Sequence, residues 1–252
     1  MNETHTQTHR ERERERERDK MRREPQTESV AEPKQNTAGM QADISSLGQL
    51  LVSEDDALVY LIPSFFSADD CKDIFEKLKT DVSFQRARDD FGPQERLSAY
   101  YGDPGCTFAY VGLVCEPSPW PQWLDDVRNR VNEGIARRIH ATECTACLIN
   151  EYKEGQGAIV WHSDEVRAHG EAKLVISVSM GGVRSFWLRT KKKKDREIRI
   201  RLPVGSALVM SGETQTYWEH ALPLQSRDDP HRISLTFRSI EAGYEDGREP
   251  PH

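Results

Sequence analysis

The stretch RISLTFR, residues 232–238, alternates polar and apolar side chains without interruption. Successive side chains of a β-strand point to opposite faces, so the stretch predicts a strand with one core face and one polar face. The core face comprises Ile233, Leu235 and Phe237, and the polar face Arg232, Ser234, Thr236 and Arg238. An arginine that faces a protein interior is costly unless an anion meets it. The polar face therefore either binds an anion, such as a dicarboxylate, or lies open to solvent.

Other segments of the chain show the same strand signals. Residues 174–180, 198–202 and 205–210 are alternating or apolar, and the turn signals Gly181-Gly182 and Pro203-Val204-Gly205 separate them. The stretch ALVYLIPSFF, residues 57–66, predicts a buried strand that enters a turn at Pro63. This succession of short strands predicts an α+β, mainly β fold: a double-stranded β-helix (jelly roll) with supporting helices on one side.

Two segments predict the supporting helices. Ser67, with Asp70 three places later, forms a capping-box-like start for the first helix. The second is expected from about Pro121 to Ile139, because apolar residues recur there at every fourth position. Such a stripe is typical of scaffold packing, so we expect no chemistry from it.

Composition divides the 252 residues into three parts. Residues 1–45 contain the Glu/Arg repeat of residues 11–18 and almost nothing apolar, which predicts a disordered charged tail. A solvated, ion-paired helix is the alternative for the repeat. Residues 46–240 are expected to form one folded domain, and residues 241–252 a polar C-terminal tail. The net charge of −7 argues against a wholly basic nucleic-acid coat but permits a local basic patch.

Cysteine content and hydropathy indicate the expected compartment. Five cysteines, an odd number, and no apolar signal-like stretch near the start argue against a secreted disulfide framework. No run approaches the roughly 18 apolar residues that a membrane-spanning helix needs. We therefore expect a soluble, intracellular protein in the nucleus or cytoplasm, without membrane attachment. We also expect a monomer.

Three residues are candidates for a metal site. His162 and Asp164 lie two positions apart, so in an extended segment their side chains point to the same side. His220 lies near the end of the strand series, where a folded-back sheet brings it alongside. Two imidazoles and one carboxylate leave three positions of an octahedral ion open, which suits iron(II) that binds a keto acid and dioxygen. By itself, an H-x-D pair also occurs by chance on a protein surface.

A second polar pair supports the metal site. Asn150 and Tyr152, again two positions apart, lie just upstream of the H-x-D pair and can hydrogen-bond an acid. The acid would be the one that Arg232 and Arg238 attract, for which 2-oxoglutarate is a fitting dicarboxylate. The four residues predicted to carry the catalysis are His162, Asp164, His220 and Arg232.

Five motifs occur in a fixed order: Asn150-x-Tyr152, WHSDE (161–165), SVSMGGVRSF (177–186), WEHALP (218–223) and RISLTFR. In this order and approximate spacing they resemble the AlkB family of nucleic-acid dealkylases, from about Tyr100 to Ile240. The resemblance implies that residues 46–240 are an Fe(II)/2-oxoglutarate dioxygenase domain that uses O2. Its iron ligands would be His162, Asp164 and His220, and its 2-oxoglutarate contacts Asn150, Tyr152, Arg232 and Arg238, one arginine pairing with the distal carboxylate.

The resemblance also implies a substrate pocket. Phe108 and Tyr110 share a face and match positions where the target base stacks, although two core aromatics are the alternative. Glu165 stands where some members carry an aspartate that helps to recognise the base edge, so the base preference stays open. The cation-rich run from Lys191 to Arg201, with Arg184 and Arg189 ahead of it, is a candidate phosphate contact, with a nuclear-import address or a solvated loop as alternatives.

The family's reaction, carried over to this chain, is the oxidative dealkylation of N-alkylated bases in DNA or RNA. It releases formaldehyde, succinate and carbon dioxide. The expected partner is alkylated DNA or RNA, with single strands somewhat favoured. A 2-oxoglutarate-dependent hydroxylase or demethylase of a protein side chain is the second hypothesis. A non-enzymatic adaptor would require loss of the metal ligands, and all three residues are present.

Overall fold

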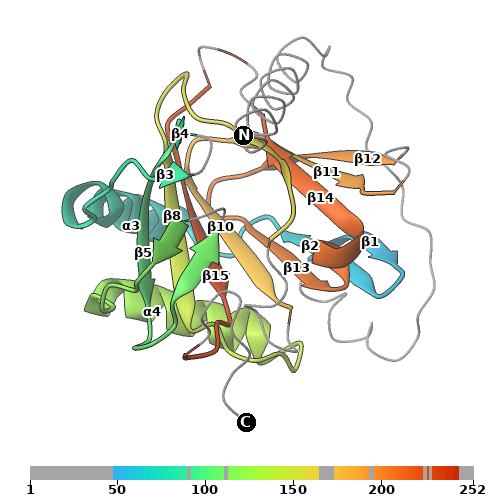
Figure 1. The fold of residues 1–252 in the computed structure, drawn as a ribbon, viewed down its shortest axis with the longest axis horizontal. Helices are drawn as coiled ribbons and strands as arrows, with labels where there is room; N and C mark the ends of the chain where they lie inside the picture. The colour runs from blue at the N-terminus through green and yellow to red at the C-terminus, as the bar shows by residue number, and fades with distance from the viewer. Residues whose placement is uncertain are drawn as a thin grey trace, which may run out of the picture.

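A seven-stranded and a four-stranded sheet make up the body of the protein (Figure 1). The computed structural model describes residues 48–89, 92–110, 113–164, 173–192, 196–223, 226 and 229–243. In spatial order the larger sheet consists of β1 (Gln49–Glu54), β2 (Ala57–Ile62), β13 (Ala207–Gly212), β10 (Val175–Gly181), β15 (Arg232–Arg238), β8 (Ala146–Tyr152) and β5 (Leu97–Gly102). The smaller sheet consists of β12 (Glu197–Leu202), β11 (Arg184–Thr190), β14 (Trp218–Leu222) and β9 (Ile159–His162).

All pairings within these two sheets are antiparallel, as expected for the predicted mainly β jelly roll. Two short hairpins accompany the sheets: β3 (Arg88–Asp89) pairs with β4 (Gly92–Pro93), and β6 (Phe108–Tyr110) with β7 (Leu113–Cys115). The predicted fold class is confirmed.

The strands lie close to their predicted positions. RISLTFR forms β15 over its whole length, and its three apolar side chains are completely buried. Strand β13 begins two residues later than predicted, at Ala207, because Gly205 adopts a φ of 76° in a turn. A Cβ on Gly205 would lie 2.6 Å from Cys71 Sγ, so the turn also packs closely against the first helix.

Two helices cover one face of the larger sheet (Figure 1). Helix α3 (Ala68–Asp81) begins with the predicted capping box, in which Ser67 and Asp70 each accept a hydrogen bond from the other's backbone N–H. Helix α4 (Gln122–Val131) carries the predicted apolar stripe, and its buried residues join those of α3 in one hydrophobic cluster. The same cluster contains the three apolar side chains of β15, so the helices and the sheet share this core.

The second helix differs from its prediction in its last part. The α-helix ends at Val131, and a π-helical turn, η1 (Asn132–Ala136), follows it. Gly134 packs closely against Phe65, since a Cβ there would lie 2.8 Å from the Phe65 ring. The Asn132 side chain accepts a hydrogen bond from Cys144 N, at 2.8 Å. Both contacts lie at the π-helical turn, in a segment that apolar periodicity alone extends as an α-helix to Ile139.

A second hydrophobic cluster lies between the two sheets and includes Val175 of the larger sheet and Leu188 of the smaller one. Polar side chains line another part of the space between the sheets, where the candidate site lies. No helix among the described residues is long and apolar enough to cross a membrane. The predicted N-terminal tail, residues 1–45, and most of the predicted C-terminal tail lie outside the described residues.

Candidate metal centre and co-substrate pocket

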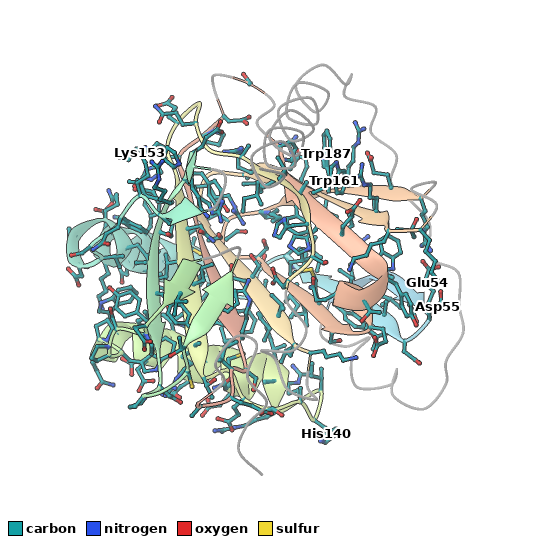
Figure 2. The ribbon with its side chains drawn as sticks, in the orientation of Figure 1. Glu54, Asp55, His140, Lys153, Trp161 and Trp187 are labelled. Atoms are coloured by element: carbon teal, nitrogen blue, oxygen red, sulfur yellow. The ribbon has the colours of Figure 1, made fainter. Side chains whose placement is uncertain are left out.

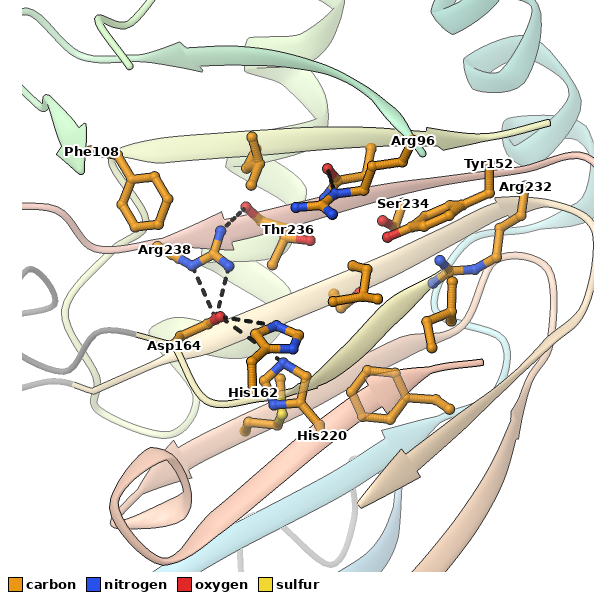
Figure 3. Close-up of a pocket in the computed structure, with 17 residues that line it drawn as sticks. Arg96, Phe108, Tyr152, His162, Asp164, His220, Arg232, Ser234, Thr236 and Arg238 are labelled. Carbon is orange, nitrogen blue, oxygen red and sulfur yellow. Dashed lines mark hydrogen bonds and ion pairs between the residues drawn. The ribbon is translucent and has the colours of Figure 1, made fainter. Parts of the chain in front are cut away.

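Two paired strands of the smaller sheet bring the predicted metal ligands together (Figure 3). The register of β9 and β14 places His162 directly opposite His220, and Asp164 follows β9 after one residue. One ligand atom from each of the three side chains lies within 4.8 Å of the other two. In the described part of the chain, no other group of three His, Cys, Asp or Glu side chains comes this close.

The donor atoms converge on one carboxylate oxygen. The Nε2 atoms of His162 and His220 lie 3.8 Å and 4.0 Å from Asp164 Oδ1. His162 Nδ1 lies 2.8 Å from the backbone oxygen of Val160, so an Nδ1–H donates to it and leaves the Nε2 lone pair free. Metal–ligand distances of about 2.1 Å allow an ion to sit between donors with this separation.

Burial keeps both imidazoles neutral. Burial, together with the neighbouring His162, lowers the pKa of His220 to about 3. Burial likewise lowers the pKa of His162. The ring of Phe186 stacks on His220, with centroids 5.3 Å apart. Neutral imidazoles present lone pairs, so at neutral pH the histidines are ready to bind a cation.

Arg238 holds the second oxygen of the aspartate. Its Nη2 and Nε atoms donate to Asp164 Oδ2 at 2.8 Å and 3.2 Å. Arg238 is the last residue of β15 in the larger sheet, whereas His162 and His220 belong to the smaller sheet. The two oxygens of Asp164 therefore have separate partners, and Oδ1 remains directed at the histidines.

Arg232, at the other end of β15, is a buried cation that has no counter-ion among the described residues. It is 2% exposed, and burial lowers its pKa to about 10. One guanidinium nitrogen donates to Ser179 Oγ at 2.9 Å, but the described part of the chain offers the buried Nε no hydrogen-bond partner. Among the described residues, Arg232 forms no ion pair. A buried cation of this kind is a favourable binding site for a carboxylate ligand.

Arg184 offers a direct comparison. Both guanidinium groups flank the ring of Tyr152, at 5.8 Å for Arg184 and 5.5 Å for Arg232. Arg184 is equally buried, but it pairs with Asp229 at 3.2 Å and donates to the backbone oxygens of Gly157 and Pro223. The hypothesis that Arg184 contacts phosphate is therefore wrong, because its charge is used inside the protein.

A single pocket collects the predicted site residues whose side chains the structure describes (Figure 3). They are Phe108, Asn150, Tyr152, His162, Asp164, His220, Arg232 and Arg238. The sequence did not predict Arg96, which also lines the pocket and donates from Nε to Asn150 Oδ1 at 2.9 Å. Nothing in the sequence spacing links these two residues, because β5 and β8 become neighbours only through the sheet topology.

The predicted substrate residues are only partly described. Phe108 is buried and lines the pocket, with the Arg238 guanidinium 5.3 Å from its ring centroid. The side chain of Tyr110 and the whole of Glu165 lie outside the described residues. The roles of all three stay predictions.

The other cations of the basic stretch include two on the outer face of the smaller sheet. Arg189 pairs with Glu219 and lies 4.0 Å from the ring centroid of Trp161. Arg199 lies 4.4 Å from the ring centroid of Trp187, and Figure 2 shows both tryptophans on this side of the molecule. Phosphate binding by this stretch stays a prediction.

Comparison with known proteins gives both sequence and structural relatives. The family model described as 2OG-Fe(II) oxygenase superfamily matches residues 58–238. The DNA oxidative demethylase ALKBH2 of Mus musculus is 36% identical over 152 residues, which cover 58% of this chain and 62% of that protein. The alpha-ketoglutarate-dependent dioxygenase alkB homolog 3 of Homo sapiens is 30% identical over 206 residues, covering 77% and 68%. The chain thus spans less than two thirds of the first of these relatives.

Solved structures share the fold at low sequence identity. The structure of OsALKBH1 superposes with a TM-score of 0.52 at 17% identity, covering 76% of this chain and 100% of that one. An oxidoreductase of the 2OG-Fe(II) oxygenase family from Burkholderia pseudomallei gives 0.53 at 15% identity, covering 86% and 100%. At these identities the similarity establishes the fold alone.

Proposed function

The chain belongs to the 2OG-Fe(II) oxygenase superfamily, and from that premise we propose that it oxidatively removes alkyl groups from N-alkylated bases of nucleic acid. The observation that carries the proposal is one pocket that holds the His162/Asp164/His220 triad and a buried arginine, Arg232, for which the described residues supply no counter-ion. The similarity to proteins named DNA oxidative demethylase supports the choice of substrate class.

Family membership implies Fe(II), 2-oxoglutarate and O2, and the residues present fit these groups. The donor set of two imidazoles and one carboxylate suits Fe(II) with open coordination positions. The orphaned Nε of Arg232 suits a carboxylate. We assign His162, Asp164 and His220 to the iron, and Arg232 to the distal carboxylate of 2-oxoglutarate.

Iron bound there would supply, with O2 and 2-oxoglutarate, the oxidising power to insert one oxygen atom into an alkyl C–H bond, with 2-oxoglutarate converted to succinate and CO2. The hydroxymethyl group formed on the base nitrogen then leaves as formaldehyde, and the nitrogen regains a proton. The apolar side chains of Ile159, Phe186 and Leu222 line the pocket and limit the access of water. Arg238 holds one oxygen of Asp164 and directs the other toward the metal position.

Tyr152 and Asn150 complete the proposed co-substrate site. Tyr152 packs against Arg232 and is 2% exposed. Asn150 is held by Arg96, which fixes its side-chain amide at the pocket wall. We propose that both contact 2-oxoglutarate, together with Arg232 and Arg238.

We further propose alkylated DNA as the first substrate to test, with RNA as the alternative and with single strands favoured over duplex. A base inside a duplex must be unstacked before it reaches a pocket between two sheets, whereas a single strand avoids most of that cost. Phe108, Tyr110 and Glu165 are the proposed substrate contacts, Phe108 as an aromatic wall. We also propose a monomer that works in the nucleus or cytoplasm, where such substrates occur.

The test supplies methylated single- and double-stranded DNA and RNA oligonucleotides with Fe(II), ascorbate and 2-oxoglutarate, and follows methyl loss by mass spectrometry. We expect demethylation that is lost in His162→Ala and retained in His140→Ala, a matched change of an exposed histidine. Turnover that survives in His162→Ala would remove His162 from the metal site. Succinate release without any demethylated oligonucleotide would favour the hypothesis that the substrate is a protein side chain.

A further inference from the structure

The short helix α5 (Thr214–Tyr217) contacts the chain on both sides of residues 165–172. Gln215 Oε1 accepts a hydrogen bond from the backbone N–H of Asp164 at 2.9 Å. Glu213, the residue before the helix, forms an ion pair with Lys173. Helix α5 therefore fixes the chain directly at the proposed iron ligand.

Gln215 is buried, and its orientation is determined by its neighbours. It is 2% exposed, so its amide depends on protein partners for its hydrogen bonds. The N–H of Asp164 requires an acceptor, which places the amide oxygen on that side. The amide nitrogen lies 3.7 Å from Met210 Sδ, a weak acceptor. The two contacts together select one orientation of the side chain.

Helix α5 is in turn fixed to the larger sheet. Thr214 Oγ1 donates to the backbone oxygen of Ser211 at 2.6 Å and accepts from Leu58 N at 3.2 Å. Leu58 belongs to β2 and Ser211 to β13, which are neighbours in that sheet. Gln215 therefore connects Asp164 to the larger sheet, through a short helix that runs directly into β14, the strand that carries His220.

We propose that Gln215 is a positioning residue for Asp164: by accepting the Asp164 N–H, it holds the backbone so that Oδ1 faces His162 and His220 while Arg238 holds Oδ2. Asp164 is then fixed at two points, its backbone nitrogen and its Oδ2 atom, while Oδ1 lies toward the two histidines. This inference rests on the proposed function, because it takes Asp164 as the iron ligand.

The test measures Mn(II) binding to the metal-free, full-length protein by titration calorimetry. Gln215→Leu removes the acceptor, and Gln215→Asn withdraws it by one methylene, so both weaken Mn(II) binding by about 10- to 100-fold. Gln215→Glu keeps an oxygen at the same reach and binds Mn(II) within about threefold of the wild type. A residue that only filled space would not show rescue by glutamate and failure of asparagine.

Two controls separate positioning from general stability. Gln122→Leu makes the same change at an exposed position of α4 and leaves Mn(II) affinity unaltered. Ser67→Ala removes the N-cap of α3, lowers the Tm and also leaves the affinity unaltered. Wild-type affinity in both Gln215→Leu and Gln215→Asn, or a Gln215→Glu as weak as the leucine variant, would overturn the inference. Wild-type affinity in Asp164→Ala would instead overturn the metal assignment and with it the proposed function.

Discussion

Arg232 and Arg184 lie on the same aromatic ring, but only Arg184 has a carboxylate partner within the described residues. A buried charge without a partner destabilises the folded state. In Arg232 the protein tolerates this cost in the ligand-free state, and the proposed dicarboxylate would remove it. The unpaired charge is thus a sign of a binding function at the level of a single residue.

Replacing Arg232 by methionine tests this directly. We expect the KM for 2-oxoglutarate to rise about 10- to 100-fold, since hydrogen bonds to a charged group are lost. The Tm of the ligand-free protein should stay unchanged or rise, because an unpaired buried charge is removed. Succinate release against 2-oxoglutarate concentration gives the KM, with Arg137→Met as the exposed control. An unchanged KM would exclude Arg232 from the site.

The stability of the metal-free protein should depend on pH through His220. The folded-state pKa of about 3 lies below the ordinary value of 6.5. At a pH between these two values, His220 is therefore protonated in the unfolded chain but neutral in the folded chain. The free energy of unfolding therefore falls as the pH drops below about 6.5. Thermal unfolding at pH 7 and pH 5 should show a smaller fall of Tm in His220→Gln than in the wild type. An equal fall in both would contradict the assigned cause, and His140→Gln serves as control.

Sequence patterns predicted the candidate site residues that lie on the same face of one strand, because such residues are separated by an even number of positions. The Arg232/Arg238 face of β15 and the Asn150/Tyr152 pair of β8 are examples. Gln215 and Arg96 were missed, because each meets its partner only through tertiary structure. Arg184 was predicted to contact phosphate, but it is buried. Its side chain lies on the same face of the strand as the buried Phe186 and Leu188, which the alternation of the sequence could have indicated.

At the scale of elements, the junction between β13 and α5 depends on Gly212. Its φ is +59°, and a Cβ there would lie 2.1 Å from the backbone oxygen of Asp56. We expect Gly212→Ala to lower the free energy of unfolding by about 3 kcal/mol or more, through strain and a backbone clash. Gly243→Ala is the matched control, because φ is +82° but no atom of the described residues lies within 4 Å of a Cβ there.

Urea unfolding measures both glycine variants. Gly243→Ala should lose only about 1 kcal/mol, the strain of a left-handed alanine. Equal losses in the two variants would show that the turn at Asp56 moves aside freely, and α5 would then be less rigidly held than its contacts indicate.

The prediction of elements succeeded where side-chain periodicity matches burial, as in β15 and α3. It was wrong after Val131, where the apolar period of four continues but the backbone widens into η1. Periodicity reports which face is buried. It does not report a close contact such as that of Gly134 with Phe65, which depends on the packing of distant segments.

At the scale of the whole molecule, the hydrophobic clusters of the described residues begin near Leu50. The proposed domain boundary at residue 46 therefore predicts that residues 1–45 can be removed with little effect. We expect the shortened protein to keep its KM for 2-oxoglutarate and its Tm within about 2 °C. A larger fall in Tm would show that the first 45 residues pack against the domain.

The candidate site draws its parts from both sheets: β15 of the larger sheet supplies Arg232 and Arg238, and β9 and β14 of the smaller one supply His162 and His220. Iron and 2-oxoglutarate bound there would act as a cross-brace, so that separating the layers requires releasing both ligands. Chelation should then accelerate amide hydrogen exchange in β9 and β14 more than in β10, which lies inside the larger sheet. The candidate site would thereby also connect the two sheets, and its occupancy by ligands would determine how strongly the smaller sheet stays packed against the larger one.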